Sequence, residues 1–395
     1  MPRAGSSGAE SYNYYICQLL LKAGYQIKLI VTGDNFDTPC FINSTYENKE
    51  LFKQTYFIRY KSIFGVTVSV SFKSYLRPIK KIISRLKNNN SDKKDLMIGR
   101  FITKQEAEAS LKYIDPNSKF VIFDTIFRYH ERFTTLDNPK ILIAHDVFSE
   151  RTKSFNEQGF KVLPAIEAEV EAKVWDEFDL HVAINEDENQ LISENDKRSV
   201  CTIFPSYQSS LNSVLKLRKP KNKILYIGAN AHHNIHGLRY FLAEIWPKII
   251  HQQADAELLI VGTIAASFHS EKHSGVSFLG RVDDLCEVAN ECKFSINPVY
   301  MGSGVKIKIL DYLSLNLPCL TTTVGIMGFI RQADMPLIEV ADDEAYSKKI
   351  IDWLSDGDDL AIAINSIPNY VKLFGAENNS LRLAGCMLKA LNNDN

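Results

Sequence analysis

The sequence of 395 residues lacks several patterns that mark other classes of protein. None of its seven cysteines belongs to a C-x-x-C pair, so neither a zinc knuckle nor a redox dithiol is indicated, and we expect reduced thiols. No apolar run approaches the roughly 20 residues of a membrane-spanning helix. The first residues lack the charged and apolar regions of a signal peptide. These absences predict a cytoplasmic protein, either soluble or peripheral on the inner face of the membrane.

The sequence also lacks an excess of either charge. Lysine and arginine number 46 against 47 aspartates and glutamates, which gives a formal net charge of -1. This balance argues against a nucleic acid as partner. Hydrophobic residues make up 45% of the chain and charged residues 24%, so a globular protein is expected rather than a disordered one.

One segment departs from this balance. Residues 73–100 contain nine Lys or Arg and two Asp, a local charge of +7. Apolar residues recur there at helical spacing, namely Leu76, Ile79, Ile82, Ile83 and Leu86. The pattern predicts a basic amphipathic helix. Such a helix fits an anionic membrane surface, and it fits equally well a helix packed on its own domain with a solvated outer face.

Short β-branched runs alternate with longer stretches of helical period, which is typical of parallel sheets wrapped by helices. The length and a polar, basic linker at 209–223 predict two domains, 1–215 and 220–368. Strands are predicted at 26–32, 120–123, 140–144, 180–184 and 201–204, then at 223–227, 257–261, 276–279, 294–298 and 319–322. Helices are predicted at 10–22, 166–178, 237–252, 284–291 and 305–315. The fold class is α/β, with two Rossmann-like doubly wound domains facing across a ligand cleft.

The start of the first domain is unusual. A doubly wound domain normally opens with a strand that runs into its first glycine-rich turn. Here the turn Gly5–Gly8 comes almost at once. Either this sheet begins one strand late or the sequence lacks that strand.

The most informative motif spans residues 294–325 and reads FSINPVYMGSGVKIKILDYLSLNLPCLTTTVG. A predicted strand is followed by the turn Gly302-Ser303-Gly304 and a predicted helix from Val305. Glycines let the backbone approach a ligand, and a lysine in the first helical turn, Lys306, is unfavourable there unless an anion lies nearby. A G-x-G turn alone is also common in ordinary strand–turn–helix links. The third glycine and the later acidic residue of a dinucleotide fold are missing, which disfavours a nicotinamide enzyme.

Residues 302–325 resemble the donor-site signature of GT-B glycosyltransferases, especially glycosyltransferase family 4 (group 1 glycosyl transferases). Residues 224–249 resemble the opening strand and helix of that family's second domain. Residues 276–298 resemble the segment that precedes the family's signature. The first half is looser, with 5–32 similar to the family's glycine loop and first helix and 141–155 to its strand ending in a histidine. The resemblance implies a GT-B fold whose last segment, 369–395, crosses back to the first domain as a helix at 369–391.

The resemblance also implies roles for residues of this sequence. A nucleotide-diphosphate sugar would bind in the second domain and the acceptor in the first. The donor diphosphate would lie on Gly302, Ser303, Gly304 and Val305 with Lys306 beside it, Asp311 would bond the ribose, and Arg281 and Val282 would contact the base. His145, at the carboxyl end of its strand, would bond the donor sugar or a phosphate. His145 and Lys306 are thus the implied catalytic residues, and Gly8 and Asp146 lie on the acceptor side.

Two departures from the family pattern concern the donor side. Ser303 stands where the family carries a glutamate that often contacts the transferred sugar. Asn230 and His236 stand at about the positions of the family's arginine and lysine, which leaves Lys306 as the main diphosphate cation. We read these exchanges as a subtype that shares the GSGVK signature.

The resemblance implies a transfer to a glycan or lipid-linked acceptor, with retention, without metal and without any cofactor. The leaving phosphate itself would take the acceptor's proton, so no strong protein base is needed. The cluster His232-His233-Asn234-Ile235-His236 has no carboxylate or thiol at ligand spacing and is predicted to be a polar loop. A catalytically weak GT-B scaffold that binds a partner glycosyltransferase or a glycan is the alternative, and a nucleotide-sugar epimerase is a third possibility.

Overall fold

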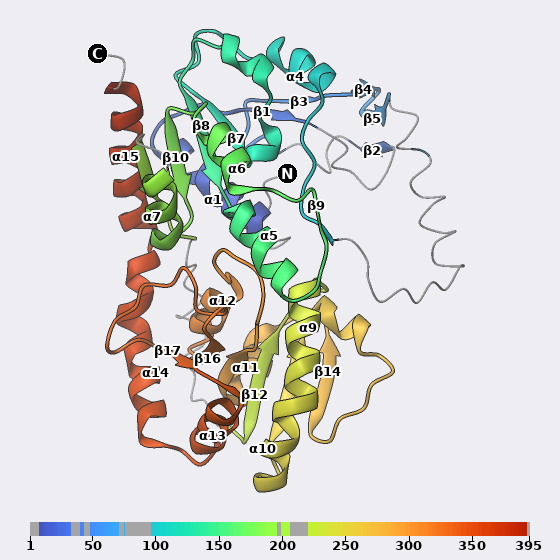
Figure 1. The fold of residues 1–395 in the computed structure, drawn as a ribbon, viewed down its shortest axis with the longest axis vertical. Helices are drawn as coiled ribbons and strands as arrows, with labels where there is room; N and C mark the ends of the chain where they lie inside the picture. The colour runs from blue at the N-terminus through green and yellow to red at the C-terminus, as the bar shows by residue number, and fades with distance from the viewer. Residues whose placement is uncertain are drawn as a thin grey trace. The chain divides into compact units, whose positions relative to one another are not determined.

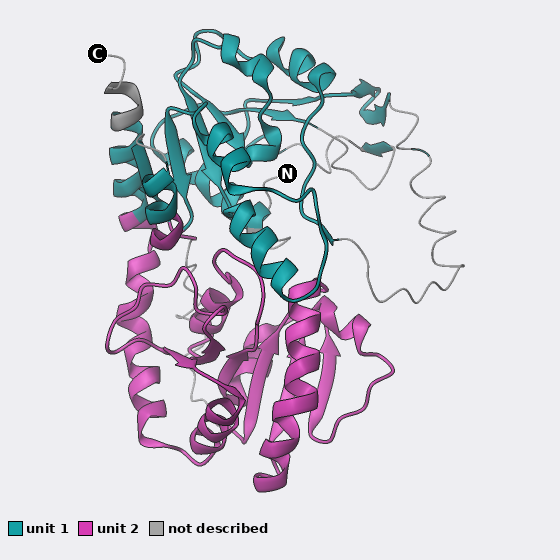
Figure 2. Cartoon of the chain, viewed as in Figure 1, with its two compact units in different colours: residues 1–184, 189–203, 379–395 teal, residues 185–188, 204–378 magenta. Residues whose placement is uncertain are grey.

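The computed structural model describes residues 8–32, 40–42, 48–70, 75, 96–195, 199–205 and 220–392. The chain divides into two compact units (Figure 2). Unit 1 contains residues 1–184, 189–203 and 379–395, and unit 2 contains 185–188 and 204–378. Each unit has its own parallel sheet and its own hydrophobic core.

Unit 2 is built on a parallel sheet of six strands in the order β14-β13-β12-β15-β16-β17. Figure 1 labels β12, β14, β16 and β17 of this sheet. The strands are β12 Lys223–Ile227, β13 Glu257–Val261, β14 Val276–Gly280, β15 Cys292–Asn297, β16 Cys319–Thr322 and β17 Leu337–Val340. The structure confirms the predicted bounds of β12, β13 and β16. The sequence analysis missed β17, a four-residue edge strand that follows directly on Pro336.

The strands of unit 2 supply two cores because successive side chains of a strand point to opposite faces. Ile224 and Tyr226 of β12 pack with α9, α10 and α13 on one face. Leu225, between them, packs with α11, α12 and η5 on the other. The helical segments are α9 His232–Tyr240, η3 Phe241–Ile245, α10 Trp246–Gln252, η4 Thr263–Ser267, α11 Leu285–Asn290, α12 Lys308–Ser314, α13 Asp343–Leu354, α14 Asp358–Tyr370 and η5 Val371–Phe374.

Unit 1 has a parallel sheet of four strands in the order β11-β10-β8-β7. Its strands are β7 Val121–Asp124, β8 Lys140–Ala144, β10 Leu180–Ala183 and β11 Ser199–Thr202. Every residue of β10 and the last four of β8 are buried, as expected for central strands covered on both faces. The predicted bounds of β8 are confirmed.

Three smaller sheets complete unit 1. β1 Lys28–Val31 pairs in parallel with β3 Gln54–Phe57, and β6 Leu96–Met97 with β9 Val162–Leu163. β2 Cys40–Ile42, β4 Tyr60–Ile63 and β5 Val66–Ser69 form an antiparallel sheet in the order β2-β5-β4. The helical segments are α1 Gly8–Lys22, α4 Lys104–Leu111, η1 Ile126–Arg128, η2 Glu131–Thr135, α5 Phe148–Glu157 and α6 Ala168–Trp175, with α7 Glu186–Asn195 and α15 Ala376–Asn392 shared between the units.

Several predicted helix boundaries are wrong. The helix predicted at 305–315 begins at Lys308, because Gly302 and Gly304 adopt positive φ angles of 107° and 69° and a turn follows them. The histidine cluster at 232–236 is the start of α9 rather than a polar loop. The single helix predicted at 369–391 is interrupted, since α14 and η5 end before Gly375 and α15 begins after it.

Two predicted segments fall outside the described residues. The linker at 209–223 lies there except for its last four residues, and so does the basic segment 73–100 except for Tyr75 and residues 96–100. Gly5 to Ser7 of the glycine turn also lie outside, whereas Gly8 opens α1. Within the described residues, no helix combines the length and the apolar character needed to cross a membrane.

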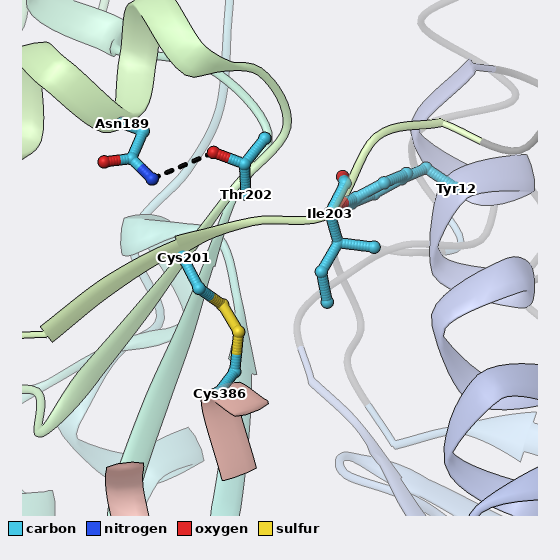
Figure 3. Close-up of a disulfide and its surroundings, with 6 residues drawn as sticks. All are labelled: Tyr12, Asn189, Cys201, Thr202, Ile203 and Cys386. Atoms are coloured by element: carbon cyan, nitrogen blue, oxygen red, sulfur yellow. Dashed lines mark hydrogen bonds between the residues drawn. A yellow bond between two sulfur atoms is a disulfide. The ribbon is translucent and has the colours of Figure 1, made fainter. Parts of the chain in front are cut away.

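The expectation of wholly reduced thiols is wrong for one pair of cysteines. A disulfide joins Cys201 in β11 to Cys386 in α15, with their Cα atoms 6.1 Å apart (Figure 3). The two residues are separated by 185 positions in the sequence, so spacing gave no sign of the pair. The bond attaches the C-terminal helix to the edge strand of the unit 1 sheet. Cys17, Cys40, Cys286, Cys292 and Cys319 are not part of a disulfide.

Candidate functional site

The predicted donor residues of unit 2 follow the carboxyl ends of adjacent strands. Asn230 follows β12, Arg281 and Val282 follow β14, and the turn from Gly302 to Lys306 follows β15. Parallel strands end at the same edge of their sheet, which is where α/β folds bind ligands. The register pairs β12 with β13 and β15, and β13 with β14, so these segments belong to one edge.

The turn after β15 is closed by Lys306. Only 8% of Lys306 is exposed, and its Nζ donates to the carbonyl oxygens of Ser303 at 2.9 Å and Gly304 at 2.8 Å. The ammonium therefore lies against the turn that the sequence predicted to hold a diphosphate. It lies before α12 rather than in its first turn, because the helix begins two residues later.

Ser303 carries a second polar group in the same turn. Its Oγ is buried and has no hydrogen-bond partner among the described residues. A buried hydroxyl without a partner is costly, so a ligand at the turn would find both a lysine charge and an unused hydroxyl. The family's glutamate is absent here, and the serine in its place offers a donor and an acceptor instead of a charge.

The loop after β16 is hydrogen-bonded to the segment that leads into the turn. Asn297, the last residue of β15, donates through Nδ2 to Thr321 Oγ1 at 3.0 Å and to the carbonyl of Gly325 at 3.2 Å. Thr322 Oγ1 donates to the carbonyl of Val299. A Cβ atom added at Gly325 would lie 2.1 Å from Thr321 Oγ1, so only glycine fits against this network. These bonds connect the start of the turn to the TTTVG segment of the motif.

Lys308 has a different environment from Lys306. Its Nζ donates to Asn234 Oδ1 of α9 at 3.0 Å and lies 4.6 Å from the centre of the Tyr226 ring. Burial lowers the pKa of Lys308 to about 7, and the charge of Lys306 adds to the effect. Lys308 thus connects α12 to α9. Helix α9 also approaches the turn closely, since a Cβ added at Gly237 would lie 1.9 Å from the carbonyl oxygen of Pro298.

The other predicted donor residues are more open. Asn230 is exposed, with its backbone N–H donating to Thr263 Oγ1 at 2.9 Å and its Oδ1 accepting from Ser267 Oγ at 2.7 Å. Arg281 is exposed, whereas Val282 packs against the second core of the unit. Asp311 is exposed as well, but the protein around its carboxyl disfavours the charge and raises the pKa to about 6.

In unit 1, His145 does not present a free ring nitrogen. The residue follows β8, and its Nε2 lies 2.6 Å from Oδ1 of Asp124, the last residue of β7. The other ring nitrogen, Nδ1, is buried without a partner among the described residues. The ring of Tyr12 packs edge-on against His145 with centroids 5.5 Å apart. Sequence reasoning missed Asp124, although two neighbouring parallel strands that both end in a polar residue were a usable signal.

Asp146, predicted on the acceptor side, forms a buried ion pair. Its Oδ2 accepts from Nη1 of Arg151 at 2.7 Å, and only 6% of Asp146 is exposed. Gly8, the other acceptor-side residue, begins α1. Within the described ranges, no group of three or more His, Cys, Asp or Glu side chains is arranged to hold a metal ion.

Comparison with known proteins defines the class of this chain. Residues 221–356 match the family described as "Glycosyl transferases group 1", and this range contains the turn, Lys306 and the TTTVG segment that supports the turn. A protein of Klebsiella pneumoniae named "Uncharacterized 44.6 kDa protein in cps region" is 26% identical over 131 residues. That match covers 30% of this chain and 34% of the other protein, so it spans about a third of the relative's length.

Solved structures extend the likeness to nearly the whole chain. Sucrose-phosphate synthase from Thermosynechococcus elongatus has a TM-score of 0.59 at 13% identity, covering 96% of this chain and 92% of that one. A glycosyltransferase from Rickettsia africae has a TM-score of 0.58 at 15% identity, covering 100% and 97%. HepE of Anabaena in complex with UDP and glucose has a TM-score of 0.55 at 13% identity, covering 97% and 96%.

These comparisons confirm the predicted fold class and the resemblance to group 1 glycosyltransferases. The chain has the GT-B fold of two Rossmann-like units, and residues 221–356 of its second unit match the group 1 glycosyltransferase family.

Proposed function

We propose that the protein is a glycosyltransferase that moves a sugar from a nucleotide-diphosphate donor to a glycan or lipid-linked acceptor. The observation that carries the proposal is the turn from Gly302 to Lys306, which lies inside the group 1 domain at the carboxyl edge of the sheet. HepE, a protein of the same fold, was solved with UDP and glucose. The match to a protein of a cps region supports a role in polysaccharide biosynthesis.

The chemistry of the turn suits a leaving diphosphate. Departure of a nucleotide diphosphate builds negative charge, and a fixed cation with backbone N–H groups stabilises that charge. Lys306 supplies the cation, and the two glycines with positive φ let the backbone approach the phosphates. Asp311 would accept hydrogen bonds from ribose hydroxyls. We further propose retention and no requirement for metal, with the leaving phosphate taking the acceptor's proton.

A panel of nucleotides and nucleotide-sugars tests this function. We expect at least one nucleotide-diphosphate sugar to raise the unfolding temperature of the full chain and to release its nucleotide when glycan acceptors are added. If a nucleotide binds without any release, the catalytically weak scaffold is favoured instead. If no nucleotide stabilises the protein, the proposed donor site is wrong. Conversion of one nucleotide-sugar into its epimer without transfer would favour the epimerase.

We also propose an anionic membrane surface as a partner of unit 1. The hairpin of β4 and β5 turns through Phe64 and Gly65, and it exposes Ile63 by 56%, Phe64 by 104% and Val66 by 39%. Phe64 has a φ of 49°, in the left-handed region that a bulky residue rarely adopts. The sequence continues from this hairpin into the basic segment 73–100, whose charge complements anionic lipid.

Vesicle flotation tests the membrane partner. We expect the protein to float with phosphatidylglycerol vesicles at low salt and to be released by high salt. Ile63→Ser should weaken flotation, whereas Ile362→Ser, at an apolar residue of unit 2 with nearly the same exposure, should not. Equal recovery with phosphatidylcholine vesicles would contradict the proposal.

A further inference from the structure

The pair formed by Asp124 and His145 is unequally exposed. Register places Asp124 of β7 opposite Ile143 of β8, so the two strand ends bring the carboxylate and the imidazole together. Only 7% of the His145 side chain is exposed, against 50% of the Asp124 side chain. With Nε2 bonded to Asp124 and Nδ1 buried, the imidazole has no nitrogen left at the surface. The carboxylate is therefore the member of the pair that a ligand can reach.

The groups around Asp124 keep it ionised. Desolvation by the surrounding protein disfavours the negative charge of Asp124, but the charge and the hydrogen bond of His145 outweigh this desolvation. With Asn13 and Arg128 they lower the pKa of Asp124 to about 2. Asp124 also acts on Cys17 of α1, since burial together with the charge of Asp124 raises the pKa of its thiol to about 12. Cys17 therefore stays neutral, and Asp124 is a fixed carboxylate at neutral pH.

We propose that Asp124, and not His145, binds the ligand in unit 1, and that it binds a hydroxyl group of a neutral sugar. An ionised carboxylate only accepts hydrogen bonds, so it matches O–H donors and repels a phosphate. His145 acts as a positioning residue that holds Oδ1 of the carboxylate, while half of the Asp124 side chain stays exposed to a ligand. The inference rests on the proposed function for the statement that the ligand is a sugar.

The low pKa of Asp124 also argues against a role as a general base. A base that works near neutral pH needs a pKa close to the working pH. A carboxylate whose ionised form is stabilised by His145 is too weak a base to take a proton near neutral pH. This agrees with the proposed retention, in which the leaving phosphate accepts the proton.

Saturation-transfer NMR on the full chain tests the binding role. The probes are methyl glycosides of glucose, galactose and N-acetylglucosamine, with inorganic phosphate as the anionic competitor. We expect at least one glycoside to bind the wild type and its affinity to fall between about tenfold and a hundredfold in Asp124→Asn, the range of a hydrogen bond to a charged group. Asp137→Asn, which changes an exposed carboxylate of the same unit, serves as the control and should leave glycoside binding unchanged. The idea is wrong if no glycoside binds, if Asp124→Asn binds as well as the wild type, or if phosphate displaces the glycoside.

A carboxyl ¹³C titration between pH 4 and 8 tests the positioning role without any substrate. Asp124 should stay ionised throughout this range in the wild type. In His145→Gln, which keeps a hydrogen-bond donor but removes the charge, the carboxyl should titrate above pH 4. A histidine that only fills space would leave the titration of Asp124 unchanged, and this result would overturn the positioning role. The nucleotide panel probes unit 2, so its failure would be distinguishable from failure of these two measurements.

Discussion

The two units differ in how their functional residues are connected. In unit 2 the turn is formed by neighbours in sequence, since Lys306 bonds to the carbonyls of Ser303 and Gly304. In unit 1 the pair at His145 and the disulfide join residues that are far apart in the sequence, Asp124 with His145 and Cys201 with Cys386. A contiguous motif can be read from the sequence, whereas a pair made by the fold can be read only from the structure.

The largest expected effect concerns the contiguous turn. Lys306→Ala should lower turnover by about 100–1,000-fold, the loss seen when one charge-stabilising donor is removed. Lys308→Met should lower it less than tenfold, because Lys308 bonds to Asn234 and Tyr226 rather than to the turn. Steady-state kinetics of nucleotide release measures both. Equal losses in the two variants would remove the role assigned to Lys306.

The next effect concerns the disulfide of unit 1. Cys386→Ser should reduce the free energy of unfolding by about 2–4 kcal/mol under non-reducing conditions. Cys40→Ser, which changes an exposed free cysteine of the same unit, should change it little. Denaturant unfolding measures the difference. A thiol count of seven in the denatured, unreduced protein, instead of the five expected, would contradict the bond.

Loss of the buried carboxylate of Glu106 should have a somewhat smaller effect on the free energy of unfolding. Glu106 of α4 is fully buried, and its carboxylate accepts from Arg100 at 2.9 Å and from the backbone N–H of Thr103 at 2.7 Å. Glu106→Gln should cost about 1–3 kcal/mol, because a buried hydrogen bond to a charge is lost. Glu108→Gln, an exposed residue of the same helix, should change stability by less than about 0.5 kcal/mol. Equal stability of the two variants in thermal unfolding would contradict the account.

The sign of the pH effect at Glu106 follows from its environment. Burial disfavours the charge, but bonds from Thr103 and Arg100 outweigh it and lower the pKa of Glu106 in the folded protein. Its stabilisation is therefore present above the unfolded pKa, near 4.3, and is lost as pH falls through the folded value. The stability difference between wild type and Glu106→Gln should shrink in acid.

The smallest effect concerns Asp311. Its pKa of about 6 means that the carboxylate is lost as pH falls through 6, so donor affinity should decline by less than about tenfold between pH 7 and pH 5. Asp311→Asn should bind the donor with an affinity that changes less over this range. Calorimetric titration at the two pH values measures the difference. A wild type whose affinity is the same at both would exclude Asp311 from the donor site.

The sequence predicted unit 2 better than unit 1 for a physical reason. β12, β13 and β16 are short apolar runs in a regular parallel sheet, and their bounds were predicted correctly. The antiparallel strands β2, β4 and β5 were missed, since their residues are partly exposed and give no apolar run. The start of α12 was misplaced because the backbone of Gly302 and Gly304 delays the helix.

The same distinction explains the predicted sites. The motif around Lys306 was found because its residues are adjacent, and His145 was found at the end of its strand. Asp124, the partner of His145, was not found, since only strand pairing brings Asp124 beside His145.

Hydrogen–deuterium exchange of the full chain with a bound nucleotide-diphosphate sugar tests the central claim most directly. The account predicts protection of the backbone amides between Gly302 and Leu310, together with those of residues 228–234, and loss of that protection in Lys306→Ala. Protection confined to unit 1, or no protection in either unit at saturating donor, would contradict a donor site at the turn after β15.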